Sequence, residues 1–327
     1  MIADQPATAV GGDGGQHLCR VFRDWQSVRG APAACYAIGN FDGVHHGHRA
    51  VIAAAQALGQ RLSAATGVLT FEPHPRQVFR PEDPPFRLTP PRLKVVALSA
   101  AGVDQVVLQR FTPAFATMDP QHFIDTVLID GLAPRAVVVG RDFCFGKGRS
   151  GSAEVLTRRL EARGIPTVIV APVAGDDGVR YSSTAIRSAL QAGTLDEAAA
   201  QLGRAFRVSG HVRRGDQRGR TIGFPTANLS LGVQLRPRFG VYAVRVAIRG
   251  QWHAGVANLG MRPTVGGTDA RLEVHVFDWS DNLYGQRIDV DLVTFLRVEH
   301  RFASLEELMQ QIRRDAETAR TVLANRS

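Results

Sequence analysis

The feature that most constrains the fold is a change of pattern near residue 205. Before it, short apolar runs alternate with helix-like stretches at about 48–64, 93–101, 120–129 and 153–163. The apolar runs that we expect to be strands are Ala34–Ile38, Gly67–Phe71, Val106–Leu108, Ala136–Val139 and Thr167–Ala171. Strands separated by helices predict an α/β fold, a parallel sheet with helices on both faces. Ligands of such sheets bind beyond the carboxyl ends of the strands. The loops after Ile38, Phe71 and Val139 are therefore the most informative ones.

The second part of the chain has a different pattern. Valine-rich runs punctuated by glycine predict an antiparallel sheet or small barrel, and they lie at Val241–Ile248, Leu272–Phe277 and Ile288–Leu296. Residues 184–202 read as helical segments broken near Gly193. Ser304–Leu323 reads as a closing helix, with Ser304 and Glu307 in capping-box spacing. A chain of 327 residues has room for these two domains.

Composition limits the partners and the compartment. No apolar run approaches the roughly 20 residues of a membrane-spanning helix, so we expect no membrane contact. Cys19, Cys35 and Cys144 are scattered and form no CxxC pair, which favours the cytoplasm. The net charge of +9 indicates anionic partners. No tract of stacking aromatics lies among the basic residues, so we expect small phosphate-rich substrates and no nucleic acid. The oligomeric state stays open.

The first motif is Gly39-Asn40-Phe41-Asp42-Gly43-Val44-His45-His46-Gly47-His48, which joins the first strand to the first long helix. Glycines allow a ligand to approach the backbone closely, and the amides of a helix N-terminus attract phosphate. His45 and His48 are three residues apart, so we expect them to share a helix face. Two imidazoles facing one phosphate can stabilise charge on a leaving group. A histidine-rich cap, or an adventitious metal site that uses His46, is the alternative, but the strand–turn–helix setting favours phosphate.

A second motif, Ser182-Ser183-Thr184-Ala185-Ile186-Arg187, follows the last predicted strand. We expect Ser183 or Thr184 to cap the next helix. Taken alone, the motif reads as an ordinary cap with a surface arginine; paired with the first motif at the far end of the same α/β unit, its hydroxyls, its free amides and Arg187 are expected to hold phosphate. The loops 70–75 and 139–148 also leave strand ends. The run from Gly140 to Gly146-Lys147 is similar to a P-loop, in which four residues separate the two glycines and Ser or Thr follows the lysine. Here five residues separate the glycines, and Gly148 follows the lysine. No GxGxxG opens the domain, so a Walker-type ATPase and a dinucleotide-binding oxidoreductase are both disfavoured.

The third motif is a basic, glycine-rich stretch at 215–224 that leads into Pro225-Thr226-Ala227-Asn228. Composition alone indicates only a flexible loop that enters a strand. Further short motifs follow in order at 240–243, 257–260, 262–264, 272–275, 283–285 and 295–297.

These motifs together resemble a known family. Residues 39–48 resemble the HxGH signature of nucleotidyltransferases, and from about residue 20 the chain resembles the bacterial bifunctional riboflavin kinase/FMN adenylyltransferases. Residues 1–19 lie outside the resemblance, and their glycine-rich sequence reads as a flexible tail. The resemblance implies a Rossmann-like FMN adenylyltransferase (FAD synthetase) domain at 20–190, a helical linker at 191–204, and a riboflavin kinase domain at 205–327, a small antiparallel barrel with a C-terminal helix. It also implies two ATP-dependent steps with Mg²⁺ as cofactor. Riboflavin becomes FMN with release of ADP, and FMN becomes FAD with release of pyrophosphate.

For the adenylyltransferase half, the resemblance implies in-line attack by the phosphate of FMN on the α-phosphate of ATP, which needs positioning and charge neutralisation rather than a protein nucleophile. His45 and His48 would contact the ATP phosphates, and Arg187 the departing pyrophosphate. Asn40 and Asp42 would either contact substrate or shape the turn. The expected binding residues of this half are Asn40, Phe41, Asp42, Gly43, Gly47, Ser182, Ser183 and Thr184.

For the kinase half, the resemblance makes Glu273 the general base that takes the proton of the ribityl 5′-hydroxyl. Thr226 and Asn228 offer hard oxygen ligands to a magnesium held mainly by phosphates and water. Arg297 would hold the flavin or its phosphate, with a surface ion pair as the alternative. The residues expected to lie against ATP are Gly215, Gly219, Gly223, Phe224 and Pro225.

Two departures from the family pattern leave this chemistry intact. His46 stands where an apolar residue is usual, so we expect no catalytic role for it, and Phe206 replaces a more common tyrosine. Two other functions stay open. One is a nucleotidyltransferase of another substrate with an unrelated β domain, and the other is a non-enzymatic flavin-binding regulator on the same fold.

Overall fold

The computed structural model describes residues 19–214, 223–264 and 267–326, without the side chains of 262–269. The predicted ATP-binding residues Gly215 and Gly219 lie outside the described residues. The chain forms two compact units. The first comprises the described residues up to Asp83 together with Pro91–Tyr181, and the second comprises Pro84–Pro90 and the described residues from Ser182 onward.

The first unit is built on a six-stranded parallel sheet in the order β1-β4-β3-β2-β5-β8. Its strands are β1 (Arg20–Phe22), β2 (Ala34–Ile38), β3 (Ala65–Glu72), β4 (Gln105–Arg110), β5 (Ala136–Gly140) and β8 (Thr167–Val170). A two-stranded antiparallel ribbon of β6 (Cys144–Phe145) and β7 (Gly151–Ser152) follows β5. All five strands expected from the sequence are present.

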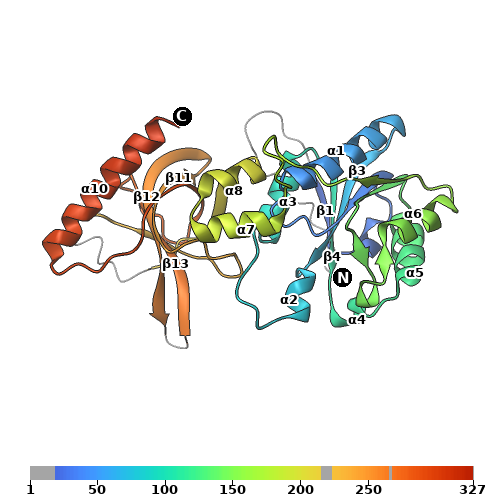
Figure 1. The fold of residues 1–327 in the computed structure, drawn as a ribbon, viewed down its shortest axis with the longest axis horizontal. Helices are drawn as coiled ribbons and strands as arrows, with labels where there is room; N and C mark the ends of the chain where they lie inside the picture. The colour runs from blue at the N-terminus through green and yellow to red at the C-terminus, as the bar shows by residue number, and fades with distance from the viewer. Residues whose placement is uncertain (1–18, 215–222, 265–266, 327) are drawn as a thin grey trace. The chain divides into compact units, whose positions relative to one another are not determined.

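Helices cover both faces of this sheet, as Figure 1 shows. Apolar residues of α1 (His46–Arg61) and α3 (Pro91–Ala100) form one core with the sheet, and those of η2 (Phe123–Leu132) and α6 (Ala153–Glu161) form the other. The remaining short helices are η1 (Trp25–Val28), α2 (Pro75–Phe79), α4 (Pro113–Ala116), α5 (Pro120–His122) and η3 (Lys147–Arg149). The helix expected at 120–129 begins as α5 and continues as the π-helix η2, which its apolar residues do not reveal.

The second unit is a six-stranded antiparallel sheet in the order β10-β13-β12-β11-β14-β9. A backbone hydrogen bond of 2.9 Å from the nitrogen of Arg213 to the oxygen of Asn228 joins the segment after β9 to β10, so the sheet is nearly closed into a barrel. The strands are β9 (Phe206–His211), β10 (Ala227–Ser230), β11 (Gly240–Ile248), β12 (Gln251–Thr264), β13 (Gly267–Val276) and β14 (Arg287–Arg297).

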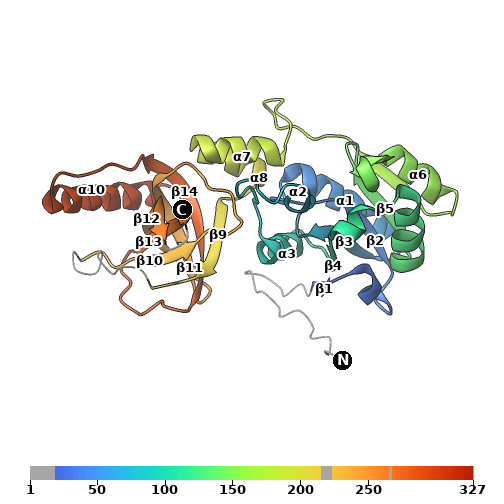
Figure 2. The ribbon, with the colours of Figure 1, turned by 90° about the horizontal axis from the view of Figure 1, so that it is seen from below.

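Three helices and one inserted segment complete the second unit. Helix α10 (Leu305–Ala324) begins at the cap Ser304 and packs on the barrel, where Figure 2 shows it beside the strands. Helices α7 (Ser183–Ala192) and α8 (Leu195–Leu202) are separated by left-handed Gly193, as expected. The segment Pro84–Pro90 places Leu88 in the barrel's core, with backbone hydrogen bonds from Arg87 to Val233 and from Leu235 to Arg87.

The predicted fold class, a Rossmann-like parallel sheet followed by a small antiparallel barrel with a C-terminal helix, is therefore confirmed. The predicted domain limits of 20–190, 191–204 and 205–327 stay a prediction. The compact units divide the chain at Tyr181 instead and assign α7 and α8 to the second unit.

Candidate active sites

The turn after β2 is held in an unusual backbone conformation. Phe41 and Val44 have φ values of 48° and 46°, and Gly43 has a φ of 96°. Val44 donates its N–H to the oxygen of Phe41 at 3.3 Å. The side chains of Phe41 and Val44 are buried in the core that α1 forms with the sheet. Packing therefore fixes this turn, and with it the exposed Asn40, the buried Asp42 and the start of α1.

The two histidines lie together, although not as the spacing predicted. His45 precedes α1 as its N-cap and accepts from the backbone N–H of His48 through Nδ1 at 3.4 Å. The two rings stack with centroids 3.7 Å apart and 21° between their planes. The prediction that the two histidines share a helix face was wrong. His45 precedes the helix with an extended backbone, and its ring folds over the first helical turn. The two imidazoles nevertheless lie against each other, with His45 buried, and their role toward ATP stays a prediction.

Gly47 makes this stack possible. A Cβ at Gly47 would lie 3.1 Å from Cε1 of His45 and 3.4 Å from the backbone oxygen of Tyr181. Any side chain there would press on the ring that the site needs. His46 turns elsewhere, with its ring 5.1 Å from that of Tyr181, so it lies outside the stack.

A buried charged network lies beside the turn, and sequence reasoning missed it. Lys94 of α3 is fully buried and pairs with Glu72 of β3 at 2.6 Å. It also donates to Oγ1 of Thr70 at 3.3 Å, and Thr70 donates to the backbone oxygen of Asn40 at 3.0 Å. The rarity of lysine was a signal that could have drawn attention to Lys94. Of the 39 basic residues, only Lys94 and Lys147 are lysines.

A cluster of phenylalanines stands at the carboxyl ends of β3 and β4. Phe111 lies 6.0 Å from Phe71, 5.7 Å from Phe79 and 5.8 Å from Phe115, measured between ring centroids. Phe79 is 64% exposed. This edge of the sheet therefore offers an aromatic surface, which the sequence analysis did not single out because its members come from separate loops.

The second motif begins the second compact unit. Ser182, rather than the expected Ser183 or Thr184, caps α7 by accepting from the N–H of Ala185 at 3.1 Å. Arg187 donates through Nε to the backbone oxygen of Phe86 at 2.8 Å, and its guanidinium lies 5.4 Å from the ring of Phe86. The expected grouping of Arg187 with the two histidines stays a prediction.

In the barrel, three polar residues form a row across neighbouring strands. Glu273 of β13 is the register partner of Asn228 on β10 and of Asn258 on β12. Directly opposed residues of antiparallel strands point to the same face, with Cβ atoms about 4.5–5.5 Å apart. The structure therefore places Glu273 beside Asn228, as the kinase reading requires.

The oxygen donors at this place suit a magnesium ion. The side-chain oxygen of Asn228 is buried and has no hydrogen-bond partner, while its nitrogen donates to the backbone oxygen of Thr226 at 3.4 Å. A buried acceptor without a donor is costly unless a ligand completes it. Within the described part of the chain, no three His, Cys, Asp or Glu side chains could hold a metal together. An amide and a hydroxyl fit Mg²⁺ that keeps phosphate and water as its other ligands.

A cavity of about 210 Å³ opens beside these residues. Thr226 and Asn228 line it, together with Val274, Val276 and the loop Trp279–Tyr284. The loop is braced internally, because Trp279 donates to the oxygen of Asp281 at 3.0 Å and the N–H of Tyr284 donates to the side chain of Asn282 at 2.9 Å. Of this loop the sequence singled out only residues 283–285.

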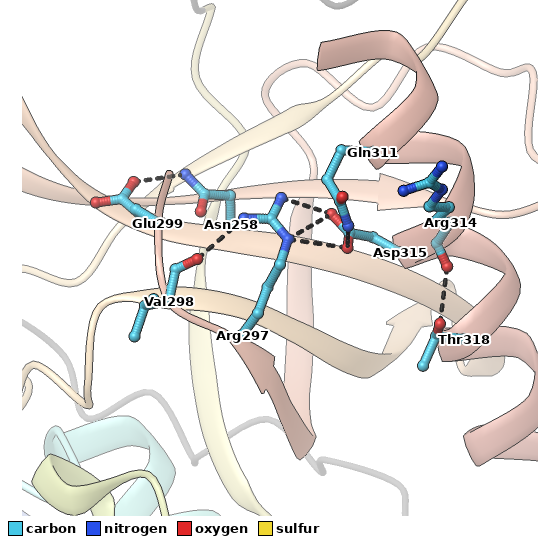
Figure 3. A network of polar contacts seen from close by, with 8 residues as sticks. All are labelled: Asn258, Arg297, Val298, Glu299, Gln311, Arg314, Asp315 and Thr318. Atoms are coloured by element: carbon cyan, nitrogen blue, oxygen red, sulfur yellow. Dashed lines mark hydrogen bonds and ion pairs between the residues drawn. The ribbon is translucent and has the colours of Figure 1, made fainter. Parts of the chain in front are cut away.

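Arg297, expected to hold the flavin, is engaged with the protein. Its Nε and Nη2 bind the carboxylate of Asp315 on α10 at distances from 2.6 to 3.1 Å, and Nη1 donates to the oxygen of Val298 at 2.9 Å. Gln311 donates to the same carboxylate at 2.9 Å, and in the same network Asn258 donates to Glu299 at 3.0 Å (Figure 3). The ion pair that the sequence left open is present, and a contact with flavin stays a prediction.

A larger hollow of about 520 Å³ lies at the opposite, amino-terminal edge of the parallel sheet, lined by residues that include Gly59, Ser63, Thr66 and Asp104. It contains none of the motif residues. Since ligands of parallel sheets bind at the carboxyl ends of the strands, the histidine stack stays the predicted first site.

Two family models and several curated relatives match this chain. The family model for FAD synthetase matches residues 29–185, and the one for riboflavin kinase matches residues 202–323. The bifunctional riboflavin kinase/FMN adenylyltransferase of Escherichia coli K12 is 45% identical over 86% of this chain and 90% of its own length. This chain belongs to the bifunctional riboflavin kinase/FMN adenylyltransferase family. The family's enzymes from Pseudomonas fluorescens and Bacillus subtilis are 41% and 35% identical, over 93% and 88% of this chain and 98% and 92% of theirs.

A solved structure shares the architecture of this family member. A protein from Streptococcus pneumoniae, described as a macrolide-efflux protein, superposes with a TM-score of 0.81 at 31% identity, over 92% of this chain and 98% of its own. In this chain, no helix within the described residues has the length and apolar character to cross a membrane.

Proposed function

We propose that this chain phosphorylates riboflavin to FMN with ATP in its second unit, and adenylylates FMN to FAD with release of pyrophosphate in its first unit. The observation that carries the proposal is the pairing of Glu273 with Asn228 in one unit, while the other unit holds the stacked His45 and His48. Neither a nucleotidyltransferase with an unrelated β domain nor a flavin-binding regulator accounts for both.

In the adenylyltransferase unit, the oxygen of the FMN phosphate attacks the α-phosphorus of ATP and the bond to the β-phosphate breaks. His45 and His48 bind the ATP phosphates and stabilise the charge that develops on pyrophosphate. The phenylalanine cluster around Phe111, with exposed Phe79, offers a stacking surface to the flavin rings.

In the kinase unit, Glu273 takes the proton of the ribityl 5′-hydroxyl as its oxygen attacks the γ-phosphorus of ATP, and ADP leaves. A bound Mg²⁺ would supply charge neutralisation on the phosphates, with Thr226 and the buried oxygen of Asn228 as its protein ligands. The cavity beside them would take the nucleotide, with the loop Trp279–Tyr284 as its wall. All three cysteines are free, which suits action in a reducing cytoplasm.

The test is a product assay with purified full-length protein. Incubated with riboflavin, ATP and Mg²⁺, the protein should form FMN first and FAD later, with pyrophosphate released in step with FAD. Supplied FMN should give FAD without a lag. Binding of flavin with no turnover would support the regulator instead, and FAD formation only from supplied FMN would remove the kinase activity from the proposal.

A further inference from the structure

The segment Gly223–Thr226, which we call the turn before β10, is joined to β13 by a side-chain hydrogen bond. Strand β10 begins at Ala227, which pairs with Val274, so Pro225 and Thr226 lie before the ladder. Proline has no N–H to donate. The backbone oxygen of Pro225 lies 2.9 Å from Nδ1 of His275. A carbonyl oxygen can only accept, so Nδ1 of His275 carries the hydrogen and donates it.

His275 itself contacts two aromatic rings. Its ring meets that of Phe224 at 5.2 Å and that of Phe277 at 5.9 Å, both in edge-on geometry. Phe277 is buried in the core that the barrel forms with α10. The guanidinium of Arg320 on α10 lies 4.3 Å from the Phe277 ring and donates to both oxygens of Asp278 at 2.9 Å. The donor to Pro225 therefore lies on a strand that packs against α10 through Phe277.

Little else described holds the turn. Gly223, two residues before Pro225, has a φ of 82°, which leaves a bend at that point. The oxygen of Thr226 accepts from Asn228 at 3.4 Å, which is long for a hydrogen bond. The bond from His275 thus extends the β10–β13 pairing by a side chain at the place where the backbone ladder stops.

We propose that His275 is a positioning residue of the kinase site. By binding the oxygen of Pro225, it fixes the backbone that leads into Thr226 and Asn228, and so presents both oxygen donors to the magnesium–ATP complex. His275 stands two residues from Glu273 on the same face of β13, so one strand face supplies both the base and the support of the metal seat. The inference rests on the proposed kinase activity.

The competing role is packing, since the imidazole also fills space between Phe224 and Phe277. Two variants separate the roles. His275→Phe keeps an aromatic ring and loses the donor, whereas His275→Asn keeps an N–H donor near the position of Nδ1 and loses the ring. His211→Ala, at an exposed histidine on β9, is the matched control.

The experiment measures initial rates of FMN formation by each full-length variant as Mg²⁺ is varied at saturating riboflavin and a fixed excess of ATP. His275→Phe loses one hydrogen bond, so we expect the Mg²⁺ concentration at half-maximal rate to rise about 3–10-fold. Its kcat should change by less than about threefold. His275→Asn should stay within about twofold of the parent chain, and His211→Ala should be unchanged. Conversion of supplied FMN to FAD should be equal in all of them.

Thermal melting of each variant completes the test. An unaltered Mg²⁺ dependence of His275→Phe overturns the inference. So does an equal kinase loss in the Phe and Asn variants with lowered melting temperatures, which identifies a packing role. If the parent chain forms no FMN, the proposed kinase activity itself is refuted. This outcome differs from the two above, which refute only the role of His275.

Discussion

At the scale of single residues, backbone conformation sets the geometry of the first site before any ligand binds. Phe41 and Val44 occupy the left-handed region, at a cost of the order of 1–3 kcal/mol each. Their burial in the core offsets that cost. The histidine stack is consequently built on a turn that the fold holds in place.

Gly240, at the start of β11, has no space for a side chain. A Cβ there would lie 2.2 Å from the backbone oxygen of Arg297, and its φ is 149°. We expect Gly240→Ala to lower the free energy of unfolding of the second unit by about 3 kcal/mol or more, through the clash and the strained backbone. Gly250→Ala is the control, because Gly250 has a φ of 84° but no atom within 4 Å of a Cβ, and it should cost only about 1 kcal/mol. Similar melting curves for the two variants would contradict this account.

The three cysteines should differ in reactivity. Burial, with a smaller effect of the Asp104 carboxylate, raises the pKa of the Cys19 thiol to about 12, and burial also raises the pKa of Cys35. The thiolate is the reactive form, so both thiols stay protonated at pH 8. Cys144 is exposed. Mass spectrometry after brief alkylation of the native protein should find Cys144 modified first, and early modification of Cys19 or Cys35 would speak against the described packing.

At the scale of elements, α3 and β3 are joined by a charge pair as well as by apolar contacts. Lys94 places an ammonium group at full burial against Glu72, whose side chain is 12% exposed. The same lysine contacts Thr70, which binds the backbone of Asn40. Helix packing is thereby connected to the turn that begins the first site.

Removing that lysine should be costly. Lys94→Met fills similar space but leaves Glu72 without its cation, and breaking a buried pair in this way costs roughly 3–5 kcal/mol. Denaturant unfolding should show the loss in Lys94→Met and no loss in Lys147→Met, at the exposed second lysine. A Lys94 variant as stable as the parent would mean that the pair contributes nothing net.

At the scale of the whole molecule, the order of elements followed from the sequence because apolar strand runs and helical patterns are local. The five predicted strands, the break at Gly193 and the cap at Ser304 are all present. Features that depend on distant segments were not predicted. Lys94 meets β3 only through packing, and Leu88 lies in the barrel core although the chain on either side of Pro84–Pro90 belongs to the first unit.

In the two sites as well, local sequence patterns predicted some features, and others depend on the folded structure. The motif residues were found by resemblance, and the register that sets Asn228 opposite Glu273 agrees with their expected roles. The stack of His45 on His48 depends on a cap conformation that spacing alone does not encode. The bond from His275 to Pro225 depends on where β10 begins, which no local pattern reveals.

The measurement that tests the two-site account most directly compares His48→Ala with Glu273→Gln in the flavin product assay. General-base help is typically worth about 10²–10⁴-fold, so Glu273→Gln should lose FMN formation by that order yet still convert supplied FMN to FAD. His48→Ala should do the reverse and accumulate FMN without FAD. If each variant lost both activities in parallel, the claim of two independent phosphate sites would be contradicted.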